Sequence, residues 1–206
     1  MRLGLIILWL AWCAAHSLLI TRATCGWFER KGGAWPALHR LGYVCFSGAS
    51  LLPLLWLTAK MPQQPLALPA WLVPIRVAGC LYALVMFVGG LRAYDLQSFL
   101  GLRQWSDYRQ GRAATPPLFQ QVGILQVVRH PWYSGGIALL WSVPRLTDVT
   151  LLVVILLTIY LVVGAWLEER KLHHTFGAPY RSYCQDVPML VPWKSSTTGK
   201  AGGLRL

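Results

Sequence analysis

The chain has 206 residues, of which 55% are hydrophobic and only 13% are charged, and its mean hydropathy is positive. Soluble domains usually carry about 25% charged residues, so this composition excludes an ordinary water-soluble fold and indicates an integral membrane protein. The net charge is +12, but the basic residues are spread between long apolar runs instead of clustering as a nucleic-acid-binding face requires. Five dispersed cysteines without a CxxC pair indicate neither a disulfide framework nor a zinc site. Neither nucleic acid nor a metal is therefore an expected partner.

Long apolar stretches predict helices that cross a membrane, because about 20 apolar residues span the ~30 Å hydrocarbon layer. Four stretches qualify, at residues 3–20, 41–59, 71–91 and 149–167. The first is interpreted as a retained helix and not as a signal peptide, because its apolar character continues past Cys13 to Ile20. A fifth stretch, 132–143, covers only about 18 Å as a helix. The sequence predicts an all-α polytopic membrane protein with five membrane segments, the last two forming a helical hairpin.

The distribution of basic residues predicts the orientation, because cytoplasmic loops are enriched in Lys and Arg. Fifteen of the nineteen basic residues fall in 21–40, in 92–130 and after 167. We therefore expect the N-terminus outside and the C-terminus in the cytosol, in a bacterial inner membrane. The chain is expected to have four parts. Residues 1–91 form three membrane helices and residues 92–127 a cytosolic connection. Residues 128–194 form the hairpin with the polar segment that follows it, and residues 195–206 form a disordered basic tail.

Polar residues of the first candidate site lie at the start of the hairpin, in residues 128–136. Proline is well placed in the first turn of a helix, so Pro131 predicts a helix start. The free N–H groups there, with Arg129 and His130, suit a carboxylate or phosphate, and Tyr133 offers an aromatic face to a ring or a cation. The alternative is a basic juxtamembrane patch without a ligand.

A second candidate site follows the last apolar stretch, where Glu168 and Glu169 stand side by side. Neighbouring residues on a helix point about 100° apart, so only one of the two carboxylates can face a given pocket. The alternative is that both cap the membrane interface beside Arg170 and Lys171. A cationic receptor and a carboxylate on two joined helices match the two ends of an amino-acid zwitterion. S-adenosylmethionine carries such a zwitterion, and a membrane methyltransferase follows as the hypothesis.

Five short motifs between residues 129 and 192 carry a family resemblance. They are Arg-His-Pro-x-Tyr at 129–133, Glu168-Glu169-x-x-Leu172, Phe176-Gly177-x-x-Tyr180-x-x-Tyr183, Val187-Pro188 and Pro192. Their order and spacing resemble the isoprenylcysteine carboxyl methyltransferase family and, more broadly, the membrane methyltransferases that include the phospholipid methyltransferases. Shorter stretches at 15–18 and 99–104 are similar to segments of bacterial methanethiol S-methyltransferases.

This resemblance implies S-adenosyl-L-methionine as the cofactor, enclosed at the cytosolic surface by residues 128–194. Carried over by position, the cofactor-binding residues would be Arg129, His130, Pro131, Tyr133, Glu168, Glu169, Tyr180 and Tyr183. Glu168 or Glu169 would take the methionine amino group. Arg129 and His130 would be the catalytic residues, with His130 a candidate base for a thiol acceptor.

The acceptor is expected to be small or lipophilic, and a thiol above all. The prenylcysteine enzymes tend to have basic residues before Val-Pro, whereas Gln185 and Asp186 stand here, which disfavours a carboxylate acceptor. The alternatives are a prenylcysteine carboxyl group, a phospholipid amine, and a non-catalytic carrier or accessory subunit that keeps the fold. Membrane lipid is the other expected partner. His16 is interpreted equally as a helix-packing residue or a substrate contact, and the adjacent His173 and His174 as surface residues.

Overall fold

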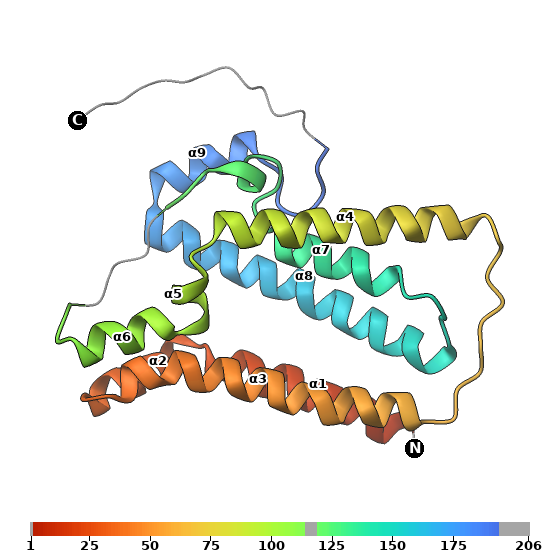
Figure 1. The fold of residues 1–206 in the computed structure, drawn as a ribbon, viewed down its shortest axis with the longest axis horizontal. Helices are drawn as coiled ribbons and strands as arrows, with labels where there is room; N and C mark the ends of the chain where they lie inside the picture. Colours follow the sequence, from red (N-terminus) through yellow and green to blue (C-terminus); the bar gives the residue numbers. More distant parts are fainter. Residues whose placement is uncertain (1, 114–118, 194–206) are drawn as a thin grey trace.

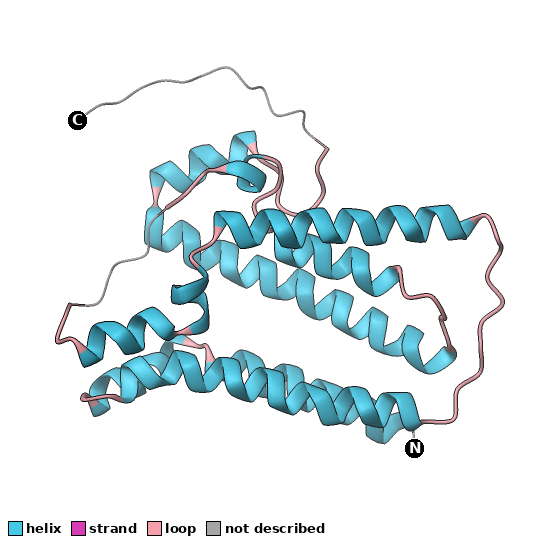
Figure 2. Ribbon diagram, in the orientation of Figure 1, coloured by secondary structure: helices cyan, strands magenta, loops and turns pink. Residues whose placement is uncertain are grey.

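The computed structural model of the chain describes residues 2–113 and 119–193, so the predicted basic tail at 195–206 lies outside the described residues. Within those two ranges the regular elements are helices, and the single β feature is an isolated bridge between Pro65 and Thr147 (Figure 2). The prediction of an all-α fold is confirmed.

Among the described residues, four helices are long and apolar enough to cross a membrane. They are α1 (Arg2–Leu19), α3 (Trp35–Lys60), α4 (Leu72–Ala93) and α8 (Asp148–Phe176). Each contains one of the four long apolar stretches, apart from a terminal residue or two, and α8 continues past the predicted end into the Glu168-Glu169 motif. Much of the large apolar surface of these helices faces outward, as in an integral membrane protein. The short stretch becomes α7 (Pro131–Trp141), whose 11 residues make a helix only about 16 Å long.

The helices form two layers (Figure 1). In the first layer, α1 and α3 pack together with α2 (Arg22–Lys31), and α5 (Leu96–Leu100) and α6 (Leu102–Arg109) lie against α3. In the second layer, α7 packs on α4 and α8. The layers meet where Trp9 is fully buried beside Leu54 and Val149, so α1, α3 and α8 share one apolar core. The indole N–H of Trp9 donates to Thr58 Oγ1 at 3.1 Å, which satisfies its one polar atom.

Small residues bring α7 close to α4. A Cβ on Gly90 would lie 2.1 Å from Nε1 of Trp132, and one on Gly135 would lie 2.9 Å from Cβ of Met86. The Trp132 N–H donates to the Phe87 carbonyl at 3.3 Å, across the same contact. The start of α7, with the Arg-His-Pro motif, is therefore fixed against α4.

The opposite ends of the helices are joined by hydrogen bonds. Thr147 caps α8 and donates to Oε1 of Gln63 at 2.7 Å, while Leu66 N–H donates to the Leu146 carbonyl at 3.0 Å. Asp148 accepts from Gln64 N–H at 2.8 Å and pairs with Arg2. The connection between α3 and α4 is thus bound to the connection between α7 and α8.

Beyond α8 the chain turns back over the start of α7 and the end of α8. Gly177 has a φ of +61°, a left-handed conformation that glycine tolerates, and α9 (Ala178–Asp186) follows it. The next residues return to the start of α7, where Arg129 N–H donates to Pro188 O at 3.0 Å and His130 N–H to Met189 O at 3.1 Å. The short 3-10 helix η1 (Gly123–Gln126) also lies there, because the Tyr183 hydroxyl donates to Leu125 O.

Candidate active site

Glu169 is the centre of a buried hydrogen-bonded cluster. Its side chain accepts from Arg129 Nε at 3.0 Å and Nη2 at 2.8 Å, and lies 2.6 Å from His130 Nε2. The hydroxyl of Tyr180 donates to the same carboxylate at 2.6 Å. Glu169 is only 7% exposed, so its charge needs such partners. One carboxylate on α8 therefore holds both the start of α7 and α9.

Arg129 is saturated by this arrangement. Its Nη1 donates to the carbonyl oxygens of Cys184 at 3.2 Å and Val187 at 2.5 Å, while the rest of the guanidinium holds Glu169. Burial acts to lower the pKa of Arg129, but the hydrogen bonds and charge of Glu169 outweigh it and raise the pKa above its usual range. The guanidinium therefore stays charged and compensates Glu169.

This pairing differs from the expected roles of the two motifs. The sequence analysis placed Arg129 and one of the two glutamates at opposite ends of a zwitterion, whereas the structure joins Arg129 to Glu169. The backbone N–H groups of Arg129 and His130 are likewise occupied, by the carbonyls of Pro188 and Met189. Pro131 is buried at the first turn of α7, as its position predicted.

Glu168 points away from this cluster, as the angle between neighbouring helical residues requires. It is half-buried, near Tyr133 on α7 and Tyr94 at the end of α4. Among the described residues it takes part in no ion pair. The two carboxylates thus face different surroundings, and the interpretation of both as interfacial caps is wrong for buried Glu169.

Tyr180 and Tyr183 form the apolar side of the Glu169 cluster. Both are buried, and their rings pack edge to face at 5.8 Å with Phe119 against each. Burial raises the pKa of both phenols, and the negative charge of Glu169 raises that of Tyr180 further. Tyr180 therefore remains a protonated hydrogen-bond donor at any physiological pH.

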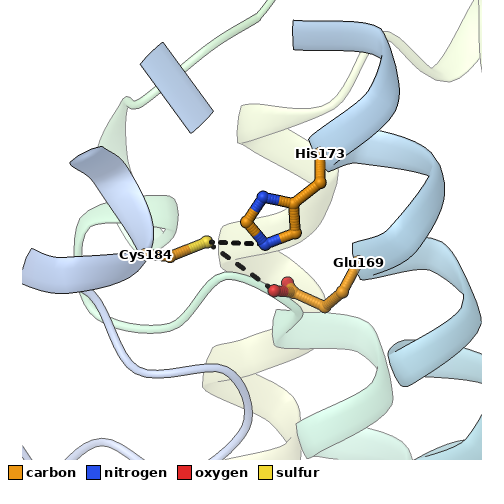
Figure 3. A group of neighbouring side chains, drawn as sticks. All are labelled: Glu169, His173 and Cys184. Carbon is orange, nitrogen blue, oxygen red and sulfur yellow. Dashed lines mark hydrogen bonds between the residues drawn. The ribbon is translucent and has the colours of Figure 1, made fainter. Parts of the chain in front are cut away.

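Two side chains that the sequence analysis set aside also reach Glu169 (Figure 3). Cys184 Sγ lies 3.7 Å from Glu169 Oε2 and 3.8 Å from His173 Nε2, and the donor atoms all lie within 4.8 Å of one another. Thiolate, imidazole and carboxylate are metal ligands, but Arg129 already compensates this carboxylate, and burial raises the pKa of the Cys184 thiol. His173 was expected at the surface, yet it packs edge-on against Tyr180 at 5.0 Å. The signal that was missed is its spacing of four residues from Glu169, which puts both on one helix face.

A separate polar cluster lies between α1, α3 and α8. We call it the inner polar cluster and define it as Trp12, His16, Ser17, Tyr43 and Tyr160. His16 Nε2 and the Tyr43 hydroxyl are joined by a hydrogen bond of 2.5 Å, and Ser17 and Tyr160 by one of 3.2 Å. Trp12 stacks on the His16 ring with centroids 4.9 Å apart. Tyr160, Gly164 and Glu168 follow one another at four-residue intervals on α8 and so share one face of that helix. A Cβ on Gly164 would lie 3.2 Å from Cε1 of Tyr133, so the same face packs against the start of α7.

Comparison with known proteins finds similarity over most of the chain. It is 37% identical to Methanethiol S-methyltransferase 1 of Bradyrhizobium diazoefficiens, across 77% of this chain and 56% of that protein. It is 34% identical to the Methanethiol S-methyltransferase of a Pseudomonas species across 91% of this chain and 72% of the relative. The Mycobacterium tuberculosis enzyme of the same name is 30% identical, across 86% and 72%. The chain thus spans little more than half the length of the first of these relatives.

No family model matches the chain, and no solved structure matches it. The similarity to these relatives nevertheless defines the class: the chain belongs to the isoprenylcysteine carboxyl methyltransferase-like family of membrane methyltransferases. Within that family, the relatives that it matches carry the name methanethiol S-methyltransferase. The resemblance found in the C-terminal motifs is confirmed.

Proposed function

We propose that this chain is an integral membrane methyltransferase that transfers a methyl group from S-adenosyl-L-methionine to a small or lipophilic thiol. The observation that carries the proposal is the 34% identity to a methanethiol S-methyltransferase across 91% of the chain. The Glu168-Glu169 motif also supports it, because its two carboxylates have different surroundings. Glu169 is bound to Arg129, whereas Glu168 has no ion-pair partner among the described residues and can accept a cation.

The donor site that we propose lies on the Glu168 side. S-adenosylmethionine carries an ammonium and a sulfonium, and both are cations that a carboxylate and aromatic faces attract. Glu168 fits this requirement, because it is half-buried beside Tyr133 and Tyr94 and has no ion-pair partner among the described residues. When bound, the donor supplies an activated methyl group on sulfur. We assign Glu168 to a cationic end of the donor, and Tyr133 and Pro131 to the wall of its pocket.

The remaining predicted site residues receive positioning roles in this proposal. His130 is only 2% exposed, and both His130 and Arg129 are hydrogen-bonded to Glu169. We therefore assign both residues to positioning the helices of the site and not to contact with the thiol. Glu169, Tyr180 and Tyr183 fix α9 over the inner ends of α7 and α8. A methyl transfer is an in-line displacement that depends on alignment and on exclusion of water, and a fixed cover supplies both.

The proposed topology follows the distribution of charge. We propose that α7 and α8 form a hairpin whose first arm begins below the membrane surface, giving five membrane segments with the four long helices. The N-terminus then lies outside, and the C-terminus and the Glu168-Glu169 motif lie on the cytosolic side of a bacterial inner membrane. Residues 92–127 form the cytosolic connection, and 128–194 form the catalytic part. The basic residues at 21–40, 92–130 and after 167 support this orientation.

Other acceptors have less support. A prenylcysteine carboxyl group and a phospholipid amine are acceptors that the broader motif resemblance implies, whereas the matched relatives are named for a thiol. Asp186 lies exposed at the end of α9, so it bears less on the choice of acceptor than its place in the sequence indicated. A non-catalytic carrier that keeps the fold differs from the enzyme in needing no methyl donor.

Donor binding tests the proposal directly. We expect purified protein in lipid nanodiscs to bind labelled S-adenosylhomocysteine in equilibrium dialysis. Glu168→Gln removes the negative charge that would accept a hydrogen bond from the donor. Losing a hydrogen bond to a charged group costs roughly 1.5–3 kcal/mol of binding free energy, so the affinity for S-adenosylhomocysteine should fall ~10- to 150-fold. Asp186→Asn is the matched control, because it removes one negative charge from an exposed position on α9. Wild-type protein that binds no donor analogue would overturn the proposed function.

A further inference from the structure

The inner polar cluster consists of hydrogen-bonding groups inside apolar helices. His16 and Ser17 belong to α1, Tyr43 to α3 and Tyr160 to α8, and all three helices are apolar enough to span a membrane. Ionisable groups within such helices are costly and mark functional sites by default. A role in helix packing alone would leave every polar atom of the cluster paired.

One atom of the cluster is not paired. Nδ1 of His16 is buried and has no hydrogen-bond partner among the described residues, whereas Nε2 bonds the Tyr43 hydroxyl at 2.5 Å. A buried polar atom without a partner costs about 1–3 kcal/mol, so it calls for a reason. If Nε2 carries the hydrogen and donates it to Tyr43, Nδ1 presents a lone pair that can take a proton.

The surroundings of this lone pair suit a small apolar thiol next to the proposed donor site. Trp12 stacks on one face of His16 and lies edge-on to Tyr160 at 6.5 Å, which gives the cluster an apolar side. Tyr160 of the cluster shares a face of α8 with Glu168, and Tyr133 packs against Gly164 between them, so the cluster lies next to the site assigned to the donor. The carboxylate would also stabilise a positive charge that forms on the imidazole.

We propose that His16 is the general base of the reaction and that the acceptor thiol binds beside it, in the inner polar cluster. The thiol S–H bond breaks and its proton moves to Nδ1 of His16. The thiolate sulfur then forms a bond to the methyl carbon as the bond between that carbon and the sulfonium breaks, which leaves two neutral thioethers. The imidazolium returns its proton to water at the inner face. This inference rests on the proposed function.

His16 fits this role better than His130, the base candidate in the Arg-His-Pro motif. His130 Nε2 is held 2.6 Å from Glu169, and its ring lies under α9 in the saturated cluster. His16 packs against Tyr160 on α8, with ring centroids 6.1 Å apart, and Tyr160 is nine residues before Glu169 and so on the opposite face of that helix. The two histidines are therefore separable by mutation.

Acceptor acidity distinguishes a base from a structural residue. An alkyl thiol is mostly protonated at pH 7, because even the more acidic cysteine thiol has a pKa of about 8.5, whereas an acidic aromatic thiol is largely ionised and needs no base. In nanodiscs, we expect His16→Gln to lower methylation of the alkyl thiol by roughly 10²- to 10⁴-fold and that of the aromatic thiol by less than about tenfold. Binding of S-adenosylhomocysteine should not change.

A second variant covers the case in which His16→Gln does not fold. Tyr43→Phe keeps the ring contact with His16 but removes the hydroxyl that orients Nε2, so it should show the same selectivity to a smaller degree. Equal losses with both thiols, or selective loss in His130→Gln and not in His16→Gln, would overturn the assignment of the base. Wild-type protein that methylates neither thiol would instead overturn the proposed function.

Discussion

Replacing Glu169 by Gln should destabilise the protein far more than the same change one residue earlier. Glu169 and Arg129 are about 9% and 10% exposed at their side chains, so Glu169→Gln leaves a buried guanidinium without its counter-charge. Breaking a buried ion pair by removing one partner costs about 3–5 kcal/mol. At about 2–4 °C per kcal/mol for a chain of this length, Tm should fall by roughly 6–20 °C.

Thermal unfolding in detergent micelles, followed by tryptophan fluorescence, measures this effect. Glu168→Gln is the matched control and should cost less than about 1 kcal/mol, because its charge has no ion-pair partner among the described residues. The double change Arg129→Met with Glu169→Leu should recover much of the loss, since it removes both charges. Equal Tm values for Glu168→Gln and Glu169→Gln, or strictly additive effects in the double variant, would refute the buried-pair argument.

Three further predictions concern packing, topology and pH. Gly90→Ala should lower the free energy of unfolding by about 1–3 kcal/mol, because the new Cβ would lie 2.1 Å from the rigid Trp132 ring. Gly48→Ala is the control and should not lower Tm, because a Cβ there meets open space. Equal effects of the two changes would contradict the contact between α4 and α7. A cysteine at 65 should react with an impermeant reagent from outside and one at 112 only after permeabilisation, and the reverse pattern would invert the proposed orientation. In His16→Gln, alkyl thiol methylation should keep rising with pH past the cysteine-like value of ~8.5, because the thiol must then ionise in solution. An equally steep wild-type profile would argue against a base.

The sequence predicted those features that depend on local residue patterns. The four long apolar runs became the long helices, and Pro131 began a short one, because helix starts and apolar length are local properties. The divergence of Glu168 and Glu169 was also predictable, since helix geometry alone separates neighbouring side chains. Which of the two was buried was not, because that depends on the rotation of α8 against α7 and α9.

The features that sequence reasoning missed depend on the return of the chain after Gly177. Residues 188–190 supply the carbonyls that bind the start of α7, and α9 supplies Tyr180 and Cys184 to Glu169. From the sequence alone Arg129 was interpreted as part of an anion receptor, because this return of the chain was not predicted. In the structure Arg129 is the counter-ion of Glu169. His173 was overlooked for the same reason, because its partners lie on α9.

The most direct test of the account is methyl transfer by the purified protein itself. Wild-type protein in nanodiscs should be incubated with methyl-labelled S-adenosylmethionine and methanethiol, with a farnesylated cysteine offered in parallel. We predict labelled volatile thioether from the thiol, reduced at subsaturating donor concentration in Glu168→Gln and unchanged in Asp186→Asn. Labelled ester on the farnesylated cysteine with no thioether from any thiol would contradict the account.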